Sequence, residues 1–247
     1  MHQSNRRNDR LLHEIMLRKQ YKYILFDLDR TLWDFDANAE NNVFTLLERH
    51  NVPIEDKHVF FKKYEEINHS LWSKYEKGEL PKEDLRWLRF HMTFLEYGID
   101  NQEFATDFGE EYLVEMPNQR ILMPHAKEVL EELHSRGCKM AVITNGFREV
   151  QHRKLKNSDI DKYFDAVLIS EEQGVHKPCP VIFKRALNAI GGVKSEALMV
   201  GDDFANDIEG AMIFGIDQFF YNYREIPCDG GPTYDSSDLR DLIRLSS

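Results

Sequence analysis

The sequence has few cysteines, only 3 among 247 residues, and Cys138, Cys179 and Cys228 form no CxxC pair. It therefore encodes neither a disulfide framework nor a thiolate zinc site, which favours a reducing, cytoplasmic environment. An apolar run of the roughly 18 residues that a membrane span requires is also missing. His13 and Glu14 interrupt the apolar patch near the start, which argues against a signal peptide. We expect a cytoplasmic protein that has no membrane partner.

Glycine and proline are sparse too, with 13 and 8 residues, which excludes collagen-like and low-complexity chains. Basic residues are outnumbered, because 32 Lys and Arg stand against 43 Asp and Glu and give a formal charge of -11. Such a chain repels polyanions, so nucleic acid is not an expected partner, and a phosphate-bearing ligand needs a local cation. Hydrophobic residues, at 42%, are abundant enough for one large domain or for a core domain with an insert.

The first 20 residues are polar and basic around a few leucines. Residues 1–20 are therefore predicted to form an N-terminal extension outside the folded core. Met16 stands shortly before the first strand pattern and offers an alternative start. Residues 1–15 would then be absent from the native protein.

Short apolar runs that favour β-strands begin at residue 21 and recur after residue 119. They cover residues 21–29, 139–146, 165–170, 197–203 and 217–222. Helical patterns lie between the later runs, at 125–136 and 180–190. Strands that alternate with helices predict an α/β fold with a doubly wound, parallel, Rossmann-like sheet, built from residues 21–35 and 119–247.

Residues 36–118 interrupt this alternation, because their apolar residues recur only at helical spacing. We predict that this segment is an all-helical cap domain, inserted between the first and second strands. The stretch 82–97 carries two apolar stripes, one from Leu85 to Leu95 and one from Trp87 to Tyr97. Two stripes on one helix predict the central, most buried helix of a small bundle.

Polar residues follow three of the predicted strands. Asp27 and Asp29 end the first, Thr144 and Asn145 end the second, and Asp202 ends the fourth. Because parallel strands deliver their carboxyl ends to one edge of a sheet, we expect these residues to line one crevice. Two close carboxylates either repel each other or share a cation. With no HxH or HExxH pattern in the chain, a carboxylate site favours Mg²⁺ over zinc.

Lys177 lies between the second and fourth predicted strands, within His176-Lys177-Pro178 and ahead of a predicted helix. It places a fixed positive charge in a chain that is acidic overall. A lysine and a metal ion together would supply the local cations that a phosphate ligand needs.

Four motifs, taken together, resemble those of the haloacid dehalogenase superfamily of phosphohydrolases. They are DLDRT at 27–31, ITN at 143–145, Lys177 in GVHKP, and GDDFAND at 201–207, and the resemblance covers residues 21 to about 245. DLDRTLWDF, TNGFREVQHRKL, SEEQGVHKPCPVIF and the helical insert look most like the subfamily that contains the pyrimidine 5'-nucleotidases. Arg30 stands where Gly or Asp is usual, and Cys179 where Asp or Asn is frequent. These two departures bear on the substrate and not on the chemistry.

The resemblance implies a role for each motif residue. Asp27 would be the nucleophile, and Asp29 would protonate the leaving group and then deprotonate water. Mg²⁺ would be held by the Asp27 carboxylate, the Asp29 backbone carbonyl and Asp202. The phosphoryl oxygens would bind to Thr144, the Asn145 amide and Lys177, and Lys177 would also neutralise Asp27. Supporting positions around these groups would be Thr31, Asp203 and Asp207.

The expected function is a Mg²⁺-dependent phosphomonoesterase that acts through an aspartyl phosphate on a small phosphate ester, with nucleoside 5'-monophosphates as the first choice. The insert would close over the site and select the leaving group. Sugar-phosphate phosphatase and phosphomutase remain open, since both share every motif. Haloacid dehalogenase chemistry is disfavoured by Asp29, because halide needs no proton to leave, and a non-catalytic binding protein is disfavoured by the intact set. The protein is expected to be a monomer or a homodimer.

Overall fold

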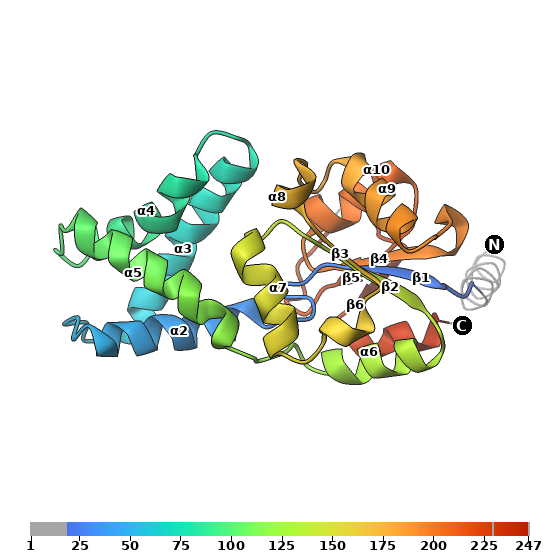
Figure 1. The fold of residues 1–247 in the computed structure, drawn as a ribbon, viewed down its shortest axis with the longest axis horizontal. Coiled ribbons are helices and arrows are strands. Elements are labelled where there is room, and N and C mark those ends of the chain that lie inside the picture. The colour runs from blue at the N-terminus through green and yellow to red at the C-terminus, as the bar shows by residue number, and fades with distance from the viewer. Residues whose placement is uncertain (1–18, 229, 247) are drawn as a thin grey trace, which may run out of the picture. The chain divides into compact units, whose positions relative to one another are not determined.

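The computed structural model describes residues 19–228 and 230–246. The chain divides into two compact units (Figure 1). The α/β unit comprises the described parts of Met1–Asp34, Leu122–Gln151 and Ser158–Ser247, and the helical unit comprises Phe35–Ile121 and His152–Asn157. Residues 1–18 of the predicted N-terminal extension lie outside the described residues. Met16, the alternative start, is among them.

The α/β unit is built on one six-stranded sheet with the order β3-β2-β1-β4-β5-β6, in which every pairing is parallel. Its strands are β1 (Tyr23–Phe26), β2 (Lys139–Thr144), β3 (Ala166–Ile169), β4 (Ala197–Gly201), β5 (Asp217–Tyr221) and β6 (Tyr234–Ser236). The order, with β1 in the middle and the chain winding outward on both sides, confirms the doubly wound α/β fold. The edge strand β6 is an addition, because its sequence Tyr-Asp-Ser has no apolar run that could have predicted it.

Helices connect the strands, as parallel pairing requires. They are α6 (Ala126–Ser135), α7 (Arg148–Asn157), α8 (Ser170–Gln173), α9 (Pro180–Ala189) and α10 (Gly210–Phe214), with the further helical segments η2 (Asp161–Tyr163), η3 (Lys194–Glu196), η4 (Phe204–Glu209) and η5 (Leu239–Arg244). Helix α7 belongs to both units, since its first residues, to Gln151, count with the sheet and the rest with the helical unit.

The core of the α/β unit lies along the central strands. Leu25 of β1, Ile143 of β2 and Met199 of β4 are fully buried and pack with Ile182 and Phe183 of α9. Strands that are buried on both faces carry continuous apolar runs, which explains why they were visible in the sequence. Because β2, β1 and β4 are neighbours, the residues that follow them arrive at one edge of the sheet.

The helical unit contains α2 (Phe35–Arg49), α3 (Lys57–Glu76), α4 (Lys82–Leu95), α5 (Gln102–Glu115) and the turn η1 (Met116–Asn118). Side-chain caps fix two of the starting points. The Asp56 carboxylate accepts hydrogen bonds from the backbone N–H groups of His58 and Val59, and the Asn101 side chain accepts one from Phe104. These caps satisfy backbone donors that have no partner within the helix. Only helices occur between β1 and α6 in the order of the described elements, which confirms the all-helical insert between β1 and β2.

Aromatic rings make up the core of the helical unit. Tyr64 of α3 stacks on Phe90 of α4 with ring centroids 5.0 Å apart, and Phe90 also meets Phe108 at 5.0 Å and Tyr112 at 5.1 Å, both from α5. Phe94 extends the cluster to α3. Each such pair adds about 0.5 to 1.5 kcal/mol beyond the area it buries.

Helix α4 occupies the central position that was predicted for 82–97, since it packs against both α3 and α5, but part of its apolar surface is exposed. Met92 and Leu95 are 39% and 43% exposed, and Tyr97 is at the surface. The buried face of α4 instead comprises Leu85, Arg89, Phe90, Thr93 and Phe94. Helix α4 packs mainly against α3 and α5, and the exposed Met92 and Leu95 belong to its Leu85–Leu95 stripe.

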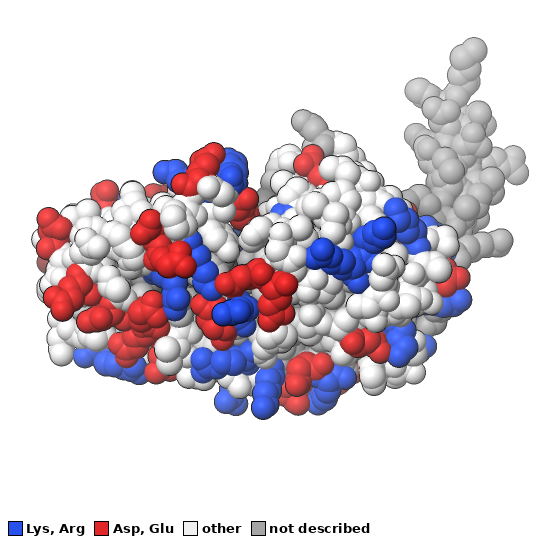
Figure 2. Space-filling model, turned by 45° about the horizontal axis from the view of Figure 1, so that its top comes forward, with Lys and Arg blue, Asp and Glu red and all other residues white. Residues whose placement is uncertain are grey.

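The surface of the helical unit carries charges of both signs. On the face drawn in Figure 2, acidic and basic side chains are interspersed over this unit. Several form ion pairs between helices, such as Arg86 of α4 with Glu110 of α5, 2.8 Å apart, and Arg49 with Glu111. Among the described residues, no helix combines the length and the apolar character needed to cross a membrane.

Candidate active site

Asp27 follows β1 directly, and its backbone N–H donates to the carbonyl of Val200 in β4 at 2.9 Å. This bond continues the sheet pairing past the end of β1 and fixes the position from which the side chain leaves. Asp27 is only 7% exposed. Burial disfavours the ionised carboxylate and raises its pKa, and Lys177 opposes that change.

Lys177 provides the counter-charge. Its Nζ lies 2.5 Å from Asp27 Oδ1 and 2.6 Å from Asp207 Oδ1, and the residue is 3% exposed. Burial alone would lower the pKa of Lys177, but the two carboxylates raise it above its ordinary value, so the ammonium group stays charged. Breaking such a buried pair by removing one partner typically costs about 3 to 5 kcal/mol.

The Asn145 side chain holds the backbone of Lys177. Its Nδ2 donates to the Lys177 carbonyl at 3.1 Å, and its Oδ1 accepts the Lys177 N–H at 2.9 Å. Asn145 was expected to bind phosphate through an amide group. Its carboxamide makes these two bonds across the sheet edge, so the residue fixes the lysine from the end of β2.

Asp207 reaches Lys177 from η4 and is fully buried. Burial raises its pKa well above the ordinary value, although Lys177 again opposes the change. Gly201 makes room for this carboxylate, because a Cβ at that position would lie 2.2 Å from Asp207 Oδ2. The first residue of the GDDFAND motif therefore has a steric reason to be glycine.

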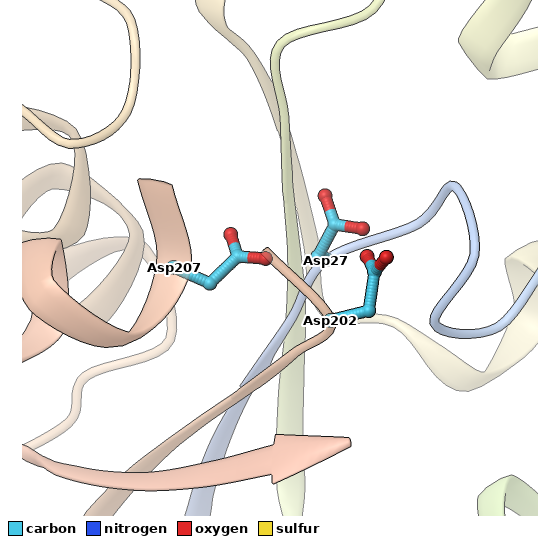
Figure 3. Close-up of side chains that lie close together, drawn as sticks. All are labelled: Asp27, Asp202 and Asp207. Atoms are coloured by element: carbon cyan, nitrogen blue, oxygen red, sulfur yellow. The ribbon is translucent and has the colours of Figure 1, made fainter. Parts of the chain in front are cut away.

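Asp202 completes a group of three carboxylates. Asp27, Asp202 and Asp207 each offer an oxygen within 4.8 Å of the others, and Figure 3 shows the Asp27 and Asp202 side chains next to each other, with the Asp207 carboxylate facing Asp27. Burial first, and then the charge of Asp27, raises the pKa of Asp202 to about 7. Thr31 donates to Asp202 Oδ1 at 3.4 Å.

These donors fit a hard divalent cation. Lys177 pairs with two of the three carboxylates, Asp27 and Asp207, and all the donors are oxygens of the kind that Mg²⁺ prefers. Both Asp207 oxygens already have partners, Oδ1 the lysine and Oδ2 the Asp203 backbone N–H. Asp27 and Asp202 are therefore the better placed carboxylate ligands of the three.

Asp29 and Thr144 are joined by a residue that the sequence did not single out. The Nε2 atom of Gln151, on α7, lies 2.8 Å from Asp29 Oδ2 and 2.7 Å from Thr144 Oγ1. Gln151 and Thr144 are both 1% exposed. Gln151 lies within the string TNGFREVQHRKL, which carries part of the family resemblance, but no role was assigned to it there.

Two further positions differ in character from this buried group. Asp203 is exposed and caps η4, where its side chain accepts the Asn206 backbone N–H at 3.0 Å, so the structure does not bring its carboxylate to Lys177. Arg30 has a φ of 67°, in the left-handed region. Gly and Asp tolerate that region better than Arg, which gives a conformational reason why Gly or Asp is usual at this position.

The chain is similar to several known hydrolases. The sequence profile of a haloacid dehalogenase-like hydrolase family matches residues 21–215. The chain is 30% identical to the pyrimidine 5'-nucleotidase PynA of Streptococcus pneumoniae, over 90% of this chain and 94% of PynA. It is 33% identical to a glyceraldehyde 3-phosphate phosphatase of Pyrococcus abyssi, over 82% of each chain. A crystal structure of the HAD-hydrolase YfnB of Bacillus subtilis bound to magnesium matches with a TM-score of 0.82 and 26% identity, over 91% of this chain and 97% of YfnB.

Proposed function

Because the chain belongs to the haloacid dehalogenase-like hydrolase family, we propose that it is a Mg²⁺-dependent phosphomonoesterase. The observation that carries the proposal is the buried array of Asp27, Lys177 and Asp207 beside Asp202. A phosphate ester and an anionic nucleophile repel each other, so their approach requires fixed positive charge. Lys177 provides one such charge within the array.

Asp27 attacks phosphorus and forms an aspartyl phosphate, which water then hydrolyses. Asp29 gives a proton to the leaving oxygen in the first step and takes one from water in the second. Asp27, Asp202 and the Asp29 backbone carbonyl would hold Mg²⁺, which would supply charge neutralisation between the nucleophile and the phosphoryl group. Asp207 keeps Lys177 beside Asp27 throughout, since it binds the same ammonium group from the other side.

The phosphoryl oxygens bind to donors at the end of β2 and to Lys177. The Thr144 hydroxyl and the Asn145 backbone N–H are the β2 donors, because the Asn145 carboxamide is occupied by the Lys177 backbone. Preorganised donors of this kind act on charge that develops in the transition state, and the loss of one typically costs about 2.7 to 4 kcal/mol. Thr31 and Asn145 support the array by holding Asp202 and Lys177.

The substrate that we propose is a nucleoside 5'-monophosphate, and a pyrimidine one in particular. Similarity to PynA over nearly the full length of both chains supports this choice. A sugar phosphate is the second candidate, supported by the similarity to the Pyrococcus abyssi phosphatase. Arg30 stands in the loop after β1, and its charge acts on Asp202, so this unusual residue belongs to the electrostatics of the site.

The test is a screen for phosphate release from pyrimidine and purine monophosphates, sugar phosphates and phosphoglycolate, ranked by kcat/KM. We expect release to require Mg²⁺, to stop on chelation, and to be fastest with a pyrimidine monophosphate. A sugar phosphate that exceeded every pyrimidine monophosphate by about tenfold, the effect of one contact worth about 1.4 kcal/mol, would replace the nucleotidase assignment. Isomerisation of a sugar phosphate without phosphate release would identify a mutase, and the absence of Mg²⁺-dependent turnover of every ester would refute the phosphatase proposal.

A further inference from the structure

We propose that Gln151 is a positioning residue that sets the hydrogen-bond polarity of the Thr144 hydroxyl and the orientation of the Asp29 carboxylate at once. The inference rests on the proposed function, because it takes Thr144 as a phosphate donor and Asp29 as the acid and base. Its basis is geometric. One amide nitrogen on α7 reaches a side chain after β1 and another at the end of β2, at 2.8 Å and 2.7 Å.

The chemistry of the neighbours fixes which end of the Gln151 amide faces them. An ionised carboxylate can accept hydrogen bonds but cannot donate them. The end of the Gln151 amide that lies opposite Asp29 Oδ2 must therefore be the NH₂ group. The same NH₂ carries two hydrogens, one for Asp29 and one for Thr144. Turning the amide over would place its oxygen against a carboxylate, which is repulsive.

Thr144 is thereby forced to act as a donor. Its hydroxyl oxygen accepts from Gln151 Nε2 and also from the Gly146 backbone N–H, at 3.2 Å. A hydroxyl has two lone pairs and one proton, so both acceptor positions are used and the proton must point in a third direction. A phosphoryl oxygen is an acceptor without protons of its own, and it is the ligand that such a hydroxyl suits.

Asp29 is oriented by the same contact. Because the NH₂ end of the Gln151 amide donates and cannot accept, Asp29 Oδ2 is held as an acceptor, which favours Oδ1 as the oxygen that carries the transferable proton. Gln151 itself contacts neither the phosphorus atom nor the leaving group. It acts through Asp29 and Thr144, and it keeps their relative geometry constant from one turnover to the next.

Gly146 provides a second observation, because its lack of a side chain leaves the space that the Gln151 side chain occupies. A Cβ at position 146 would lie 2.2 Å from Gln151 Nε2 and 2.5 Å from its Cδ, closer than atoms can approach. The φ of Gly146 is not in the left-handed region, so the backbone by itself does not require glycine there. The third residue of Thr144-Asn145-Gly146 therefore lacks a side chain where one would displace the glutamine.

The first experiment replaces the glutamine by an unbranched apolar residue of similar length, Gln151→Met, and compares two substrates. With an alkyl phosphate, which needs the proton from Asp29, we expect kcat to fall about 100-fold, the usual cost of a misplaced group. With 4-nitrophenyl phosphate, which needs little protonation, kcat should fall less than about tenfold. KM should rise about tenfold for both, because Thr144 loses its fixed donor direction. Lys156→Gln, an exposed position on α7, is the matched control and should leave all values unchanged.

The second experiment uses the glycine. Gly146→Ala should reproduce the Gln151→Met pattern by displacing the side chain, and the same substitution added to Gln151→Ala should have almost no further effect, because nothing remains to be displaced. Equal, additive losses in the two backgrounds would overturn the proposal, as would an equal loss of kcat on both substrates. Melting temperatures of all variants identify any that fail to fold, and Gly146→Ala then carries the test with Gln151 intact.

The inference can fail separately from the proposed function. Calorimetry with inorganic phosphate in the presence of Mg²⁺ requires no turnover, and we expect Gln151→Met to weaken phosphate binding about tenfold. If the wild-type protein binds phosphate but hydrolyses no ester, the proposed function fails and this comparison still judges Gln151. Equal phosphate affinity in wild type, Gln151→Met and Lys156→Gln would overturn the positioning role.

Discussion

The α/β unit and the helical unit bury charged side chains in different ways. In the α/β unit, Lys177 is enclosed by two carboxylates, Asp27 at the end of β1 and Asp207 in η4. In the helical unit, the buried Arg89 lies about 5 Å from the rings of Phe90 and Tyr112 and donates one hydrogen bond, to Asn68. Its Nε and Nη2 atoms have no hydrogen-bond partner among the described residues.

The difference shows two uses of a buried charge. Lys177 is held for chemistry by its two carboxylates, whereas Arg89 contributes to the packing of the helical unit. A lysine between two carboxylates is a preorganised electrostatic site, and it costs desolvation energy that other parts of the fold must offset. An arginine among rings contributes apolar stem area and cation–π contact, and a desolvated cation–π contact is worth about 2 kcal/mol or more. We therefore expect substitutions in the first region to reduce activity and those in the second to reduce stability.

The largest expected effect tests the first half of this comparison. Asp27→Asn removes the nucleophile and should lower kcat by roughly four orders of magnitude, as loss of a catalytic unit does. Its melting temperature should stay the same or rise, because one of three adjacent carboxylates loses its charge. The cost of breaking a buried pair is avoided here, since Lys177 keeps Asp207 and is not left unpaired. Phosphate release and thermal unfolding of one preparation provide both values. A variant that retained a tenth of the rate would remove Asp27 from the nucleophile role.

The next effect tests the helical unit. Phe90→Ala deletes a fully buried ring that contacts Tyr64, Phe108 and Tyr112, and it should cost about 3 to 5 kcal/mol of unfolding free energy. Met92→Ala, on the exposed side of the same helix, is the control and should cost less than about 1 kcal/mol. Urea titration measures both. Equal destabilisation would mean that the apolar surface around Met92 is covered in solution.

The smallest effect concerns an exposed charge of the α/β unit. Asp238 caps η5 and pairs with Arg240, whose hydrogen bonds lower the pKa of Asp238 to about 2. A carboxyl whose pKa is lower in the folded state stabilises the fold above its unfolded pKa, near 4, and loses that contribution as the pH falls toward 2.

Asp238→Ala should therefore cost about 0.5 kcal/mol at pH 7, and the difference from wild type should shrink between pH 5 and pH 3. Val181→Ala, at an exposed position of α9, removes no titratable group and should show no such change with pH. Chemical unfolding at several pH values measures this difference. A constant penalty for Asp238→Ala would assign the effect to lost packing.

The sequence predicted those features that depend on local pattern. Buried parallel strands are continuous apolar runs, so β1 to β5 were visible, and the polar residues after them lie at one sheet edge because the strands are parallel. Features that depend on contacts between distant segments were not visible. Gln151 is unremarkable until Asp29, 122 positions away in sequence, is placed beside it. In the same way, the two apolar stripes of α4 could not reveal which face the bundle covers.

The position of β1 has a consequence for synthesis of the chain. Tyr23 pairs with Lys139 on one side and with Ala197 on the other, so the first strand made is the one at the centre of the sheet. At about 5 to 20 residues per second, the ribosome needs roughly 10 to 35 s after β1 to complete β4. Most of the helical unit leaves the ribosome during that interval, so its helices can pack early while β1 waits as an exposed apolar strand. Chaperone demand should therefore peak before residue 201 emerges and fall once β4 closes the second side of the strand.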